Sequence, residues 1–285
     1  MKKKRAVIML AAVLLSVLLI SFLPAAAIIP ANKVFKYDTG KDPDGAERKE
    51  NPGNYVLKPG EYMVKNGDTL ENIAYKHGIS VTGLKWANPG CEAVPAPGLV
   101  LSIPSEHAKP LKEVMADRGL DNSNMHISIV VDKSDHILGI FSQDVFLESY
   151  HVELGDSGLG DKEVEGDHKT PEGKFYISEK SVLNPPDPYL GSRWLRISYP
   201  NIEDADRGLK KSLIGQKTHD EIINAFNNKI TTPQFTPLGG GVGIHGGSSP
   251  ELGRDWTWGC VGLKNTDIED FFDYIDIGTS LLIQG

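Results

Sequence analysis

The ten residues RDWTWGCVGL, Arg254 to Leu263, contain two tryptophans, two glycines and one of the two cysteines of the 285-residue chain. Cys260 follows a glycine and stands shortly before a segment with the apolar spacing of a helix. Two interpretations compete for a cysteine in this position. It is either half of a structural disulfide with Cys91, or a nucleophile presented on a tight turn.

The segment GGGVGIHGG, residues 239–247, carries a histidine that could serve such a nucleophile. Side chains alternate along a strand, so Val242 and Ile244 face one side while Gly243 and His245 face the other. A helix N-terminus and a neighbouring histidine both favour the thiolate form of Cys260. The pair suits nucleophilic acyl transfer. By itself, however, a cysteine with a histidine is more often structural.

The sequence around this pair is typical of a mostly β domain with few helices. Residues 126–154 hold three runs of β-branched and aromatic residues, separated by the polar breaks DKSD and SQD, which predicts three strands. GDHKTPEGKFYISEK adds a Pro–Gly turn and a further strand. The segments THDEIINAFNN and NTDIEDFFDYIDIG predict two helices, each with a Thr–Glu capping box, and SLLI closes the domain as a strand.

A smaller unit precedes this domain. Residues 62–104 predict a strand, two short helices and a closing strand. Asp68 and Glu71 have the spacing of a capping box, Gly78 is a natural helix stop, and Ser80 can cap the second helix. A β-α-α-β unit of about 45 residues makes a core that is marginal by itself.

Composition and the first residues limit the partners and the compartment. The net charge is −8, and an acidic chain is a poor match for nucleic acid. The basic MKKKR, the apolar run 6–23 and the small residues Ala25 and Ala27 predict that residues 1–27 are a signal peptide or an N-terminal membrane anchor. We therefore expect an exported protein of the periplasm or cell envelope. One histidine with one cysteine is too few ligands for a metal site.

Two known families resemble these segments. Residues from about His126 to Ile283 resemble the L,D-transpeptidase catalytic domain, also called the YkuD domain. Its G-x-x-x-T-P-x-G-x-F, HG and [ST]-x-G-C motifs match residues 166–175, 245–246 and 257–260. Residues 62–104 resemble a LysM domain through VKNGDTLENIA, GISVTGL and NP. Many YkuD members have histidine before the motif glycine and arginine two residues after the cysteine, where this chain has Trp258 and Gly262.

The resemblance implies a mainly β fold, with a β-sandwich catalytic domain preceded by a small β-α-α-β LysM domain. The expected organisation is a signal or anchor at 1–27, a linker at 28–60, the LysM domain at 61–105, a linker at 106–124 and the catalytic domain at 125–285. The implied partner is peptidoglycan, with stem peptides at the catalytic site and glycan strands at the LysM domain. Neither a cofactor nor a metal is expected.

The resemblance also implies roles for individual residues. Cys260 is the expected nucleophile and His245 the general base and acid. The Gly246 carbonyl would orient His245, and the backbone N–H groups of Gly259 and Cys260 would form the oxyanion hole. Among substrate contacts we expect Arg254, Thr257 and Trp258, with the Arg254 guanidinium binding a carboxylate in place of the missing arginine.

The implied activity is peptidoglycan L,D-transpeptidation. Cys260 forms a thioester with a donor tetrapeptide stem, D-Ala leaves, and transfer to an amine makes a 3→3 cross-link. Water, another D-amino acid or a lipoprotein lysine can resolve the same thioester, and the sequence does not choose among them. A catalytically inactive wall-binding protein is the alternative that Trp258 and Gly262 motivate. An NlpC/P60-type peptidase fits poorly, because in that family the cysteine precedes the histidine.

Overall fold

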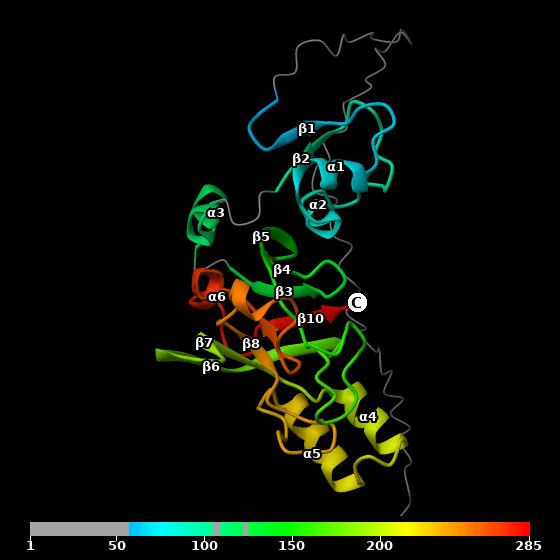
Figure 1. Ribbon diagram of the computed structural model, residues 1–285, viewed down its shortest axis with the longest axis vertical. Coiled ribbons are helices and arrows are strands. Elements are labelled where there is room, and N and C mark those ends of the chain that lie inside the picture. The colour runs from blue at the N-terminus through cyan, green and yellow to red at the C-terminus, as the bar shows by residue number, and fades with distance from the viewer. Residues whose placement is uncertain (1–56, 105–108, 122–124) are drawn as a thin grey trace, which may run out of the picture.

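The computed structural model describes residues 57–104, 109–121 and 125–285. The predicted signal or anchor at 1–27 lies outside these residues. Within them, no helix is long and apolar enough to cross a membrane. Figure 1 shows a small N-terminal unit above a larger β-rich body, with two helices packed at the far end of that body.

The N-terminal unit has the predicted β-α-α-β order. Its elements are β1 (Glu61–Met63), α1 (Leu70–His77), α2 (Val81–Ala87) and β2 (Val100–Ser102), with β1 and β2 antiparallel. The two helices pack an apolar core against this ribbon that includes Leu70, Ile73 and Leu84. Thr69, rather than the predicted Asp68, caps α1, because Asp68 instead accepts hydrogen bonds from Lys65 N–H and Tyr62 Oη.

The larger body is built on eight strands in the order β5-β4-β3-β10-β6-β7-β8-β9. The three predicted N-terminal strands are present as a meander, and the closing strand pairs parallel to the first of them. The bounds are β3 (Ile127–Asp132), β4 (Ile137–Ser142), β5 (Val145–His151), β6 (Gly173–Asp187), β7 (Gly191–Ile197), β8 (Gly243–His245), β9 (Val261–Gly262) and β10 (Ser280–Gln284).

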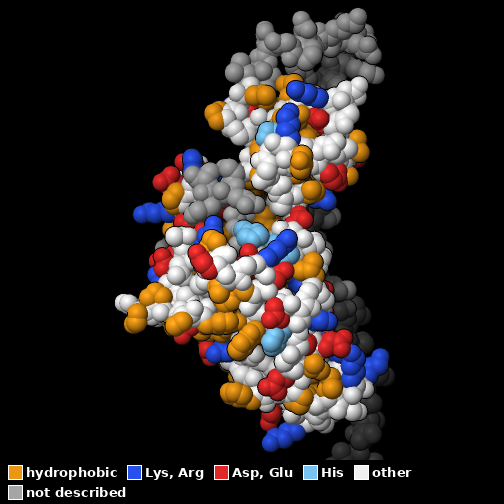
Figure 2. Space-filling model, in the orientation of Figure 1, with side chains coloured by type: hydrophobic (Ala, Val, Ile, Leu, Met, Phe, Trp, Pro, Cys, Tyr) orange, Lys and Arg blue, Asp and Glu red, His pale blue; other side chains and the backbone are white. Residues whose placement is uncertain are grey.

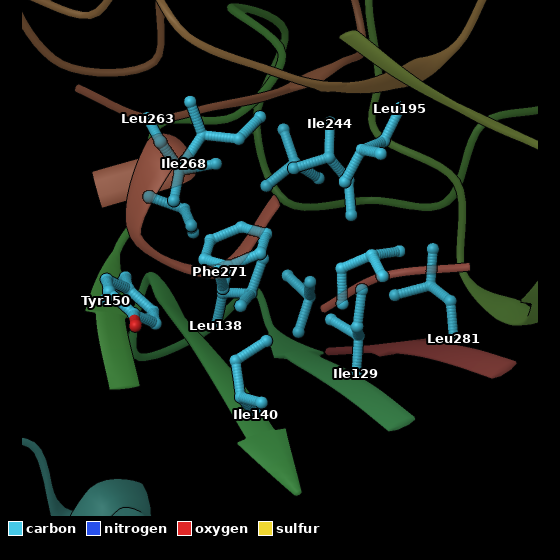
Figure 3. Packing of buried hydrophobic residues seen from close by; sticks show 14 of the residues in the cluster. Ile129, Leu138, Ile140, Tyr150, Leu195, Ile244, Leu263, Ile268, Phe271 and Leu281 are labelled. Atoms are coloured by element: carbon cyan, nitrogen blue, oxygen red, sulfur yellow. The ribbon is translucent and has the colours of Figure 1, made fainter. Parts of the chain in front are cut away.

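The sheet folds back on itself around the core. The first residues of β6 pair with β10 and its later residues pair with β7, so one long strand belongs to both halves. Isolated bridges from the chain after β5 to Gly262 and Thr257 join the two outer edges. In Figure 3, Leu195 and Ile244 face Ile129 and Leu281 across the packed interior. The result is the predicted β-rich architecture, with its core between the two halves.

One helix packs into the core of the sheet, and two others pack at the end of the body (Figure 1). The helix α6 (Asn265–Phe272) buries Ile268, Phe271 and Phe272 in the same core. The helices α4 (Ile202–Lys210) and α5 (Gln216–Asn227) pack on each other around a separate small cluster that contains Ile214 and Ile222. Their position at the end of the body is clear in Figure 1.

The range expected to be a linker, 106–124, contains the helix α3 (Leu111–Asp117). Leu111 and Met115 are buried in the core of the larger body, and the Leu111 N–H donates to the Asp270 carboxylate of α6. This helix is therefore part of the larger body. The linker prediction failed here because two apolar residues in a short helix give little periodic signal.

The N-terminal unit also packs directly on the β-rich body. The Trp86 ring of α2 meets the Phe141 ring edge-on at 5.4 Å, and a Cβ at Gly139 would lie only 2.7 Å from Trp86. The Thr82 N–H donates to Asp135 Oδ2 at 2.9 Å. A glycine on β4 thus leaves the space that the tryptophan of the other unit fills.

Candidate functional site

The register of three short strands brings the predicted catalytic residues to one face of the sheet. Ile244 pairs with Leu195 on one side and Val261 on the other, and all three lie in the core. His245 therefore faces away from the core, as its position in GGGVGIHGG predicted. Cys260 directly precedes β9, and its Sγ accepts a hydrogen bond from the Gly243 N–H.

His245 is held by one ring nitrogen and leaves the other available. Its Nδ1–H donates to the Gly246 carbonyl at 2.7 Å, the contact that was predicted to orient the ring. Nε2 is buried and has no hydrogen-bond partner among the described residues. Burial lowers the pKa of His245 to about 4, although the Gly246 carbonyl and the Asp187 charge act in the opposite direction. At neutral pH the imidazole is neutral, with the Nε2 lone pair able to accept a proton.

Cys260 is a buried thiol whose raised pKa keeps it neutral at neutral pH. Burial raises its pKa to about 11, against the lowering effects of the Gly243 N–H and of the Lys162 and Arg196 charges. Its Sγ–H donates to the Gly241 carbonyl at 3.7 Å. The expectation of a stabilised thiolate was therefore wrong. The cysteine is not at the helix terminus, since α6 begins five residues later, and burial outweighs the neighbouring charges.

Thr257 holds the turn that presents the cysteine. It is fully buried, its Oγ1–H donates to the Cys260 carbonyl at 2.7 Å, and its Oγ1 accepts from the Gly259 N–H at 3.2 Å. The Gly259 N–H that was expected in the oxyanion hole is thus engaged inside the turn. Gly259 has φ 116°, and a Cβ there would lie 2.7 Å from the Lys169 carbonyl, so only glycine fits.

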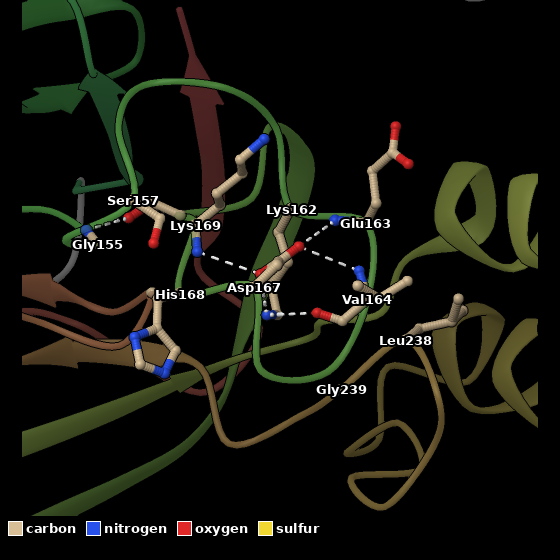
Figure 4. A network of polar contacts seen from close by, with 12 residues as sticks. Gly155, Ser157, Lys162, Glu163, Val164, Asp167, His168, Lys169, Leu238 and Gly239 are labelled. Carbon is tan, nitrogen blue, oxygen red and sulfur yellow. Dashed lines mark hydrogen bonds and ion pairs between the residues drawn. The ribbon is translucent and has the colours of Figure 1, made fainter.

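A loop on the other side of this turn contains the TPEG motif. An ion pair within the loop, between Lys162 and Asp167, stabilises its conformation. Lys162 Nζ donates to Asp167 Oδ1 at 2.7 Å and to the Val164 carbonyl, while Asp167 Oδ2 accepts the Glu163 N–H. Figure 4 shows this network beside Leu238 and Gly239, with His168 projecting from the loop. The loop therefore lies against the turn of Cys260 as a preformed structure.

Trp258 lines the exposed side of the site. It is 66% exposed, an unusual position for the largest aromatic side chain, and it stacks on His168 with ring centroids 5.7 Å apart. Tyr189, from the turn between β6 and β7, accepts the Trp258 N–H at 2.9 Å and lies 5.4 Å from the His245 ring. Trp258 takes the place of the commoner family histidine, and its ring forms an aromatic wall with His168 and Tyr189.

Arg254 makes a contact that the sequence did not predict. Its Nη2 donates to His136 Nδ1 at 2.8 Å, and His136 Nε2–H donates to the Asp255 carboxylate at 2.9 Å. These bonds fix the start of the 254–263 segment to the turn between β3 and β4. The Arg254 guanidinium thus holds this loop against His136.

Gly262, at the position of the commoner family arginine, has little room around it. A Cβ there would meet Ser248 Oγ at 3.0 Å, the Thr257 methyl group at 3.2 Å and the Trp256 ring at 3.4 Å. The indole Nε1–H of Trp256 donates to Ser248 Oγ. Trp256 and Ser248 thus occupy the space where a side chain at 262 would begin.

Sequence reasoning missed two residues that build the site. Asn265 Oδ1 accepts the N–H groups of Gly247 and Ser192, which fixes the loop after His245 to the start of β7. Tyr189 packs on His245 and Trp256. Neither residue belongs to a motif with a mechanistic signature, and only the tertiary structure shows that they lie at the site.

The two cysteines do not form the disulfide that was the alternative interpretation, because Cys91 and Cys260 are both free thiols.

No group of three or more His, Cys, Asp or Glu side chains in the described part of the chain is placed to hold a metal ion. On the face shown in Figure 2, acidic and basic side chains are interspersed over both domains.

Comparison with known proteins gives two family matches. Residues 126–283 match the L,D-transpeptidase catalytic domain, YkuD, and residues 62–104 match the LysM domain. A Bacillus subtilis (strain 168) protein with the name "Putative L,D-transpeptidase YkuD" is 25% identical over 224 residues, covering 78% of this chain and 97% of its own length.

Solved structures give weaker similarities. The helical cell shape determining protein Pgp2 from Campylobacter jejuni is 23% identical with a TM-score of 0.40, over 61% of this chain and 55% of that one. L,D-transpeptidase 1 from Mycobacterium tuberculosis is 14% identical with a TM-score of 0.31, over 56% of this chain and 62% of that one. The chain thus spans little more than half the length of these two proteins.

Proposed function

The chain belongs to the L,D-transpeptidase (YkuD) family and has an N-terminal LysM domain; from this premise we propose that it is a peptidoglycan L,D-transpeptidase with Cys260 as its nucleophile. The observation that carries the proposal is the state of His245. Its Nδ1–H is committed to the Gly246 carbonyl, which leaves Nε2 as an unpartnered base on the same face as the Cys260 thiol. Nε2 and Sγ are not hydrogen-bonded to each other in the structure, but a base and a thiol on one face are the two groups that nucleophilic catalysis requires.

The reaction begins with neutral partners. His245 Nε2 takes the proton of the Cys260 thiol as the sulfur attacks the carbonyl carbon between the third stem residue and the terminal D-Ala. The C–S bond forms and the carbonyl oxygen becomes an oxyanion. Collapse then breaks the C–N bond, and the imidazolium gives its proton to the departing D-Ala amine. The products of this half are free D-Ala and a thioester on Cys260.

The second half reverses the proton movements. An acceptor amine attacks the thioester carbonyl, His245 receives a proton from that amine, and the sulfur leaves and is reprotonated as the thiol. With an amine from a neighbouring stem the product is a 3→3 cross-link. With water as the acceptor the protein would be a carboxypeptidase, and with a protein lysine it would attach a lipoprotein.

The oxyanion is assigned to the Cys260 N–H. Among the described residues this N–H has no acceptor, whereas the Gly259 N–H donates to Thr257 Oγ1 at 3.2 Å. Gly259 contributes to the site through its backbone conformation, which shapes the turn before Cys260. Thr257 is buried, so its contribution is to hold the turn. Trp258 is exposed beside the site and is the member of the predicted substrate-binding group that can contact the stem.

The LysM domain is proposed to bind the glycan strands of peptidoglycan, in an exported protein of the cell envelope. The exposed Tyr75 and Val94 of this domain are 90% and 65% accessible and are available for contact with sugars. Packing of Trp86 on Phe141 fixes the domain to the catalytic body. A bound glycan strand would therefore be held at a set position relative to Cys260.

The proposal is tested with a disaccharide-tetrapeptide donor and mass analysis of the products. The wild-type protein should release D-Ala and form a cross-linked dimer, and Cys260→Ala should form none while keeping the wild-type unfolding transition. Free tripeptide without dimer would indicate the hydrolytic alternative. Dimer from the Cys260→Ala variant at the wild-type rate would exclude the mechanism, and no product from wild type would favour an inactive wall-binding protein.

A further inference from the structure

Arg196 of β7 lies on the reacting face of the sheet. Along β7, Trp194 pairs with His245 and Arg196 pairs with Gly243, whereas Leu195 between them is buried in the core. Since alternate residues of a strand share a face, Arg196 projects to the same side as His245. Its pairing partner Gly243 donates its N–H to the sulfur of Cys260. Arg196 on β7 and Cys260 at the start of β9 are thus separated by one strand, β8.

The guanidinium is held in place before any ligand binds. Nε donates to Glu179 Oε2 at 2.7 Å, Nη1 donates to Gln234 Oε1 at 2.9 Å, and the group lies over the Trp194 ring at 5.3 Å. Gln234 Oε1 also accepts the Gly241 N–H, and the Gly241 carbonyl accepts the Cys260 thiol. Arg196 and Cys260 are therefore linked through the Gln234 side chain and one backbone residue.

One nitrogen of Arg196 remains for a ligand. Among the described residues, no acceptor contacts Nη2, and the side chain is 22% exposed. Because two of the three nitrogens are fixed, little conformational entropy is lost when a carboxylate binds the third. Glu179 is half exposed and binds Nε on the edge of the guanidinium that Nε shares with Nη2, so a ligand carboxylate reaches Nη2 from the side that faces away from Glu179.

The second cation whose charge lowers the pKa of Cys260 is already paired. Lys162 also lowers the pKa of Cys260, but it is 4% exposed and its Nζ donates to Asp167 and to the Val164 carbonyl. The Arg254 guanidinium donates to His136. Gly262 offers no charge. Of the cations whose charge reaches Cys260, Arg196 is the one with both solvent access and an unused donor.

We propose that Arg196 binds a carboxylate of the donor stem next to the bond that Cys260 cleaves. This assignment rests on the proposed function, in which the donor carries two such groups. One is the carboxylate of the departing D-Ala, two bonds beyond the scissile nitrogen. The other is present where the third residue is a diamino diacid, whose side chain ends in a carboxylate. Both present the same chemistry to a guanidinium, and the experiment separates them.

The test is a thermodynamic cycle in which one change is made in the protein and the other in the substrate. Wild type and Arg196→Ala are compared on the unmodified tetrapeptide donor, on a donor with the terminal carboxylate amidated, and on a donor with the side-chain carboxylate amidated. On the unmodified donor Arg196→Ala should lower kcat/KM by roughly 10- to 150-fold, the scale of a hydrogen bond to a charged group. One of the two amidations should lower the kcat/KM of the wild type by the same factor. That amidation should lower the kcat/KM of Arg196→Ala by less than twofold.

Arg193→Ala is the matched control. Arg193 is on the same strand with a similar exposure of 24%, but it pairs with Glu269 and lies over Phe272 of α6. The Arg193→Ala substitution should leave kcat/KM within about twofold of the wild-type value. Arg196→Lys keeps the charge but lacks the planar fork, so it should recover part of the loss and serves if the alanine variant unfolds.

Equilibrium binding of the same donors to Cys260→Ala and Cys260→Ala/Arg196→Ala repeats the cycle without turnover. If the binding cycle holds but wild type releases no D-Ala, the proposed reaction fails and the carboxylate assignment stands. If Arg196→Ala is within twofold of wild type, or if both amidations affect both proteins equally, the assignment is overturned.

Discussion

Replacing Thr257 with valine should damage the turn that carries Cys260 without changing its volume. Valine removes the hydroxyl that donates to the Cys260 carbonyl at 2.7 Å and accepts the Gly259 N–H at 3.2 Å. The carbonyl keeps a long contact from Thr170 Oγ1 at 3.4 Å, but the buried Gly259 N–H loses its partner. A buried polar group without a partner costs about 1–3 kcal/mol, and the weakened carbonyl contact adds about 1 kcal/mol.

We therefore expect Thr257→Val to lower the free energy of unfolding by about 2–4 kcal/mol, measured by urea denaturation. Thr257→Ser keeps both hydrogen bonds and loses one buried methyl group, which should cost about 1 kcal/mol. The valine variant should also lose activity through kcat, because the turn that places the sulfur is disturbed. If Thr257→Val is as stable as wild type and raises only KM, the residue binds substrate directly and the positioning argument is wrong.

Three further results are expected. The pKa of His245 lies near 4 instead of 6.5, so wild type should lose roughly 3 kcal/mol of stability as the pH falls from 6.5 to 4, and His245→Gln should not show this loss. The raised pKa of Cys260 predicts that its alkylation rate by iodoacetamide keeps rising above pH 9, towards about 11; a plateau by pH 9 would contradict it. A fragment of residues 109–285 should fold and lose binding to insoluble peptidoglycan, whereas 125–285 lacks the buried residues of α3 and should be destabilised by several kcal/mol, as thermal unfolding would show.

Strand periodicity and motif spacing predicted the parts of the site that depend on local sequence. The alternation in GGGVGIHGG placed His245 opposite the buried Ile244, and the HG dipeptide identified the carbonyl that holds the ring. The strands of the first meander were equally clear, because β-branched runs with polar breaks are a local signal.

The remaining features depend on contacts between distant segments. The Arg254 side chain bonds to His136, 118 residues away in sequence, and nothing in RDWTWGC indicates this. The ionisation of Cys260 was predicted in the wrong direction, because a glycine-rich turn reads as exposed while tertiary packing buries it. The helix start predicted at Thr218 was also displaced, since α5 begins at Gln216 after Gly215.

If Cys260 carries the donor as a thioester, intact-mass analysis after brief mixing with the tetrapeptide donor should detect it. The added mass should equal the mass of the donor minus that of D-Ala. This mass should map to the peptide that contains Cys260, be removed by hydroxylamine, and be absent from Cys260→Ala. Release of D-Ala at the wild-type rate by Cys260→Ala, or an adduct that maps to another residue, would exclude Cys260 as the nucleophile.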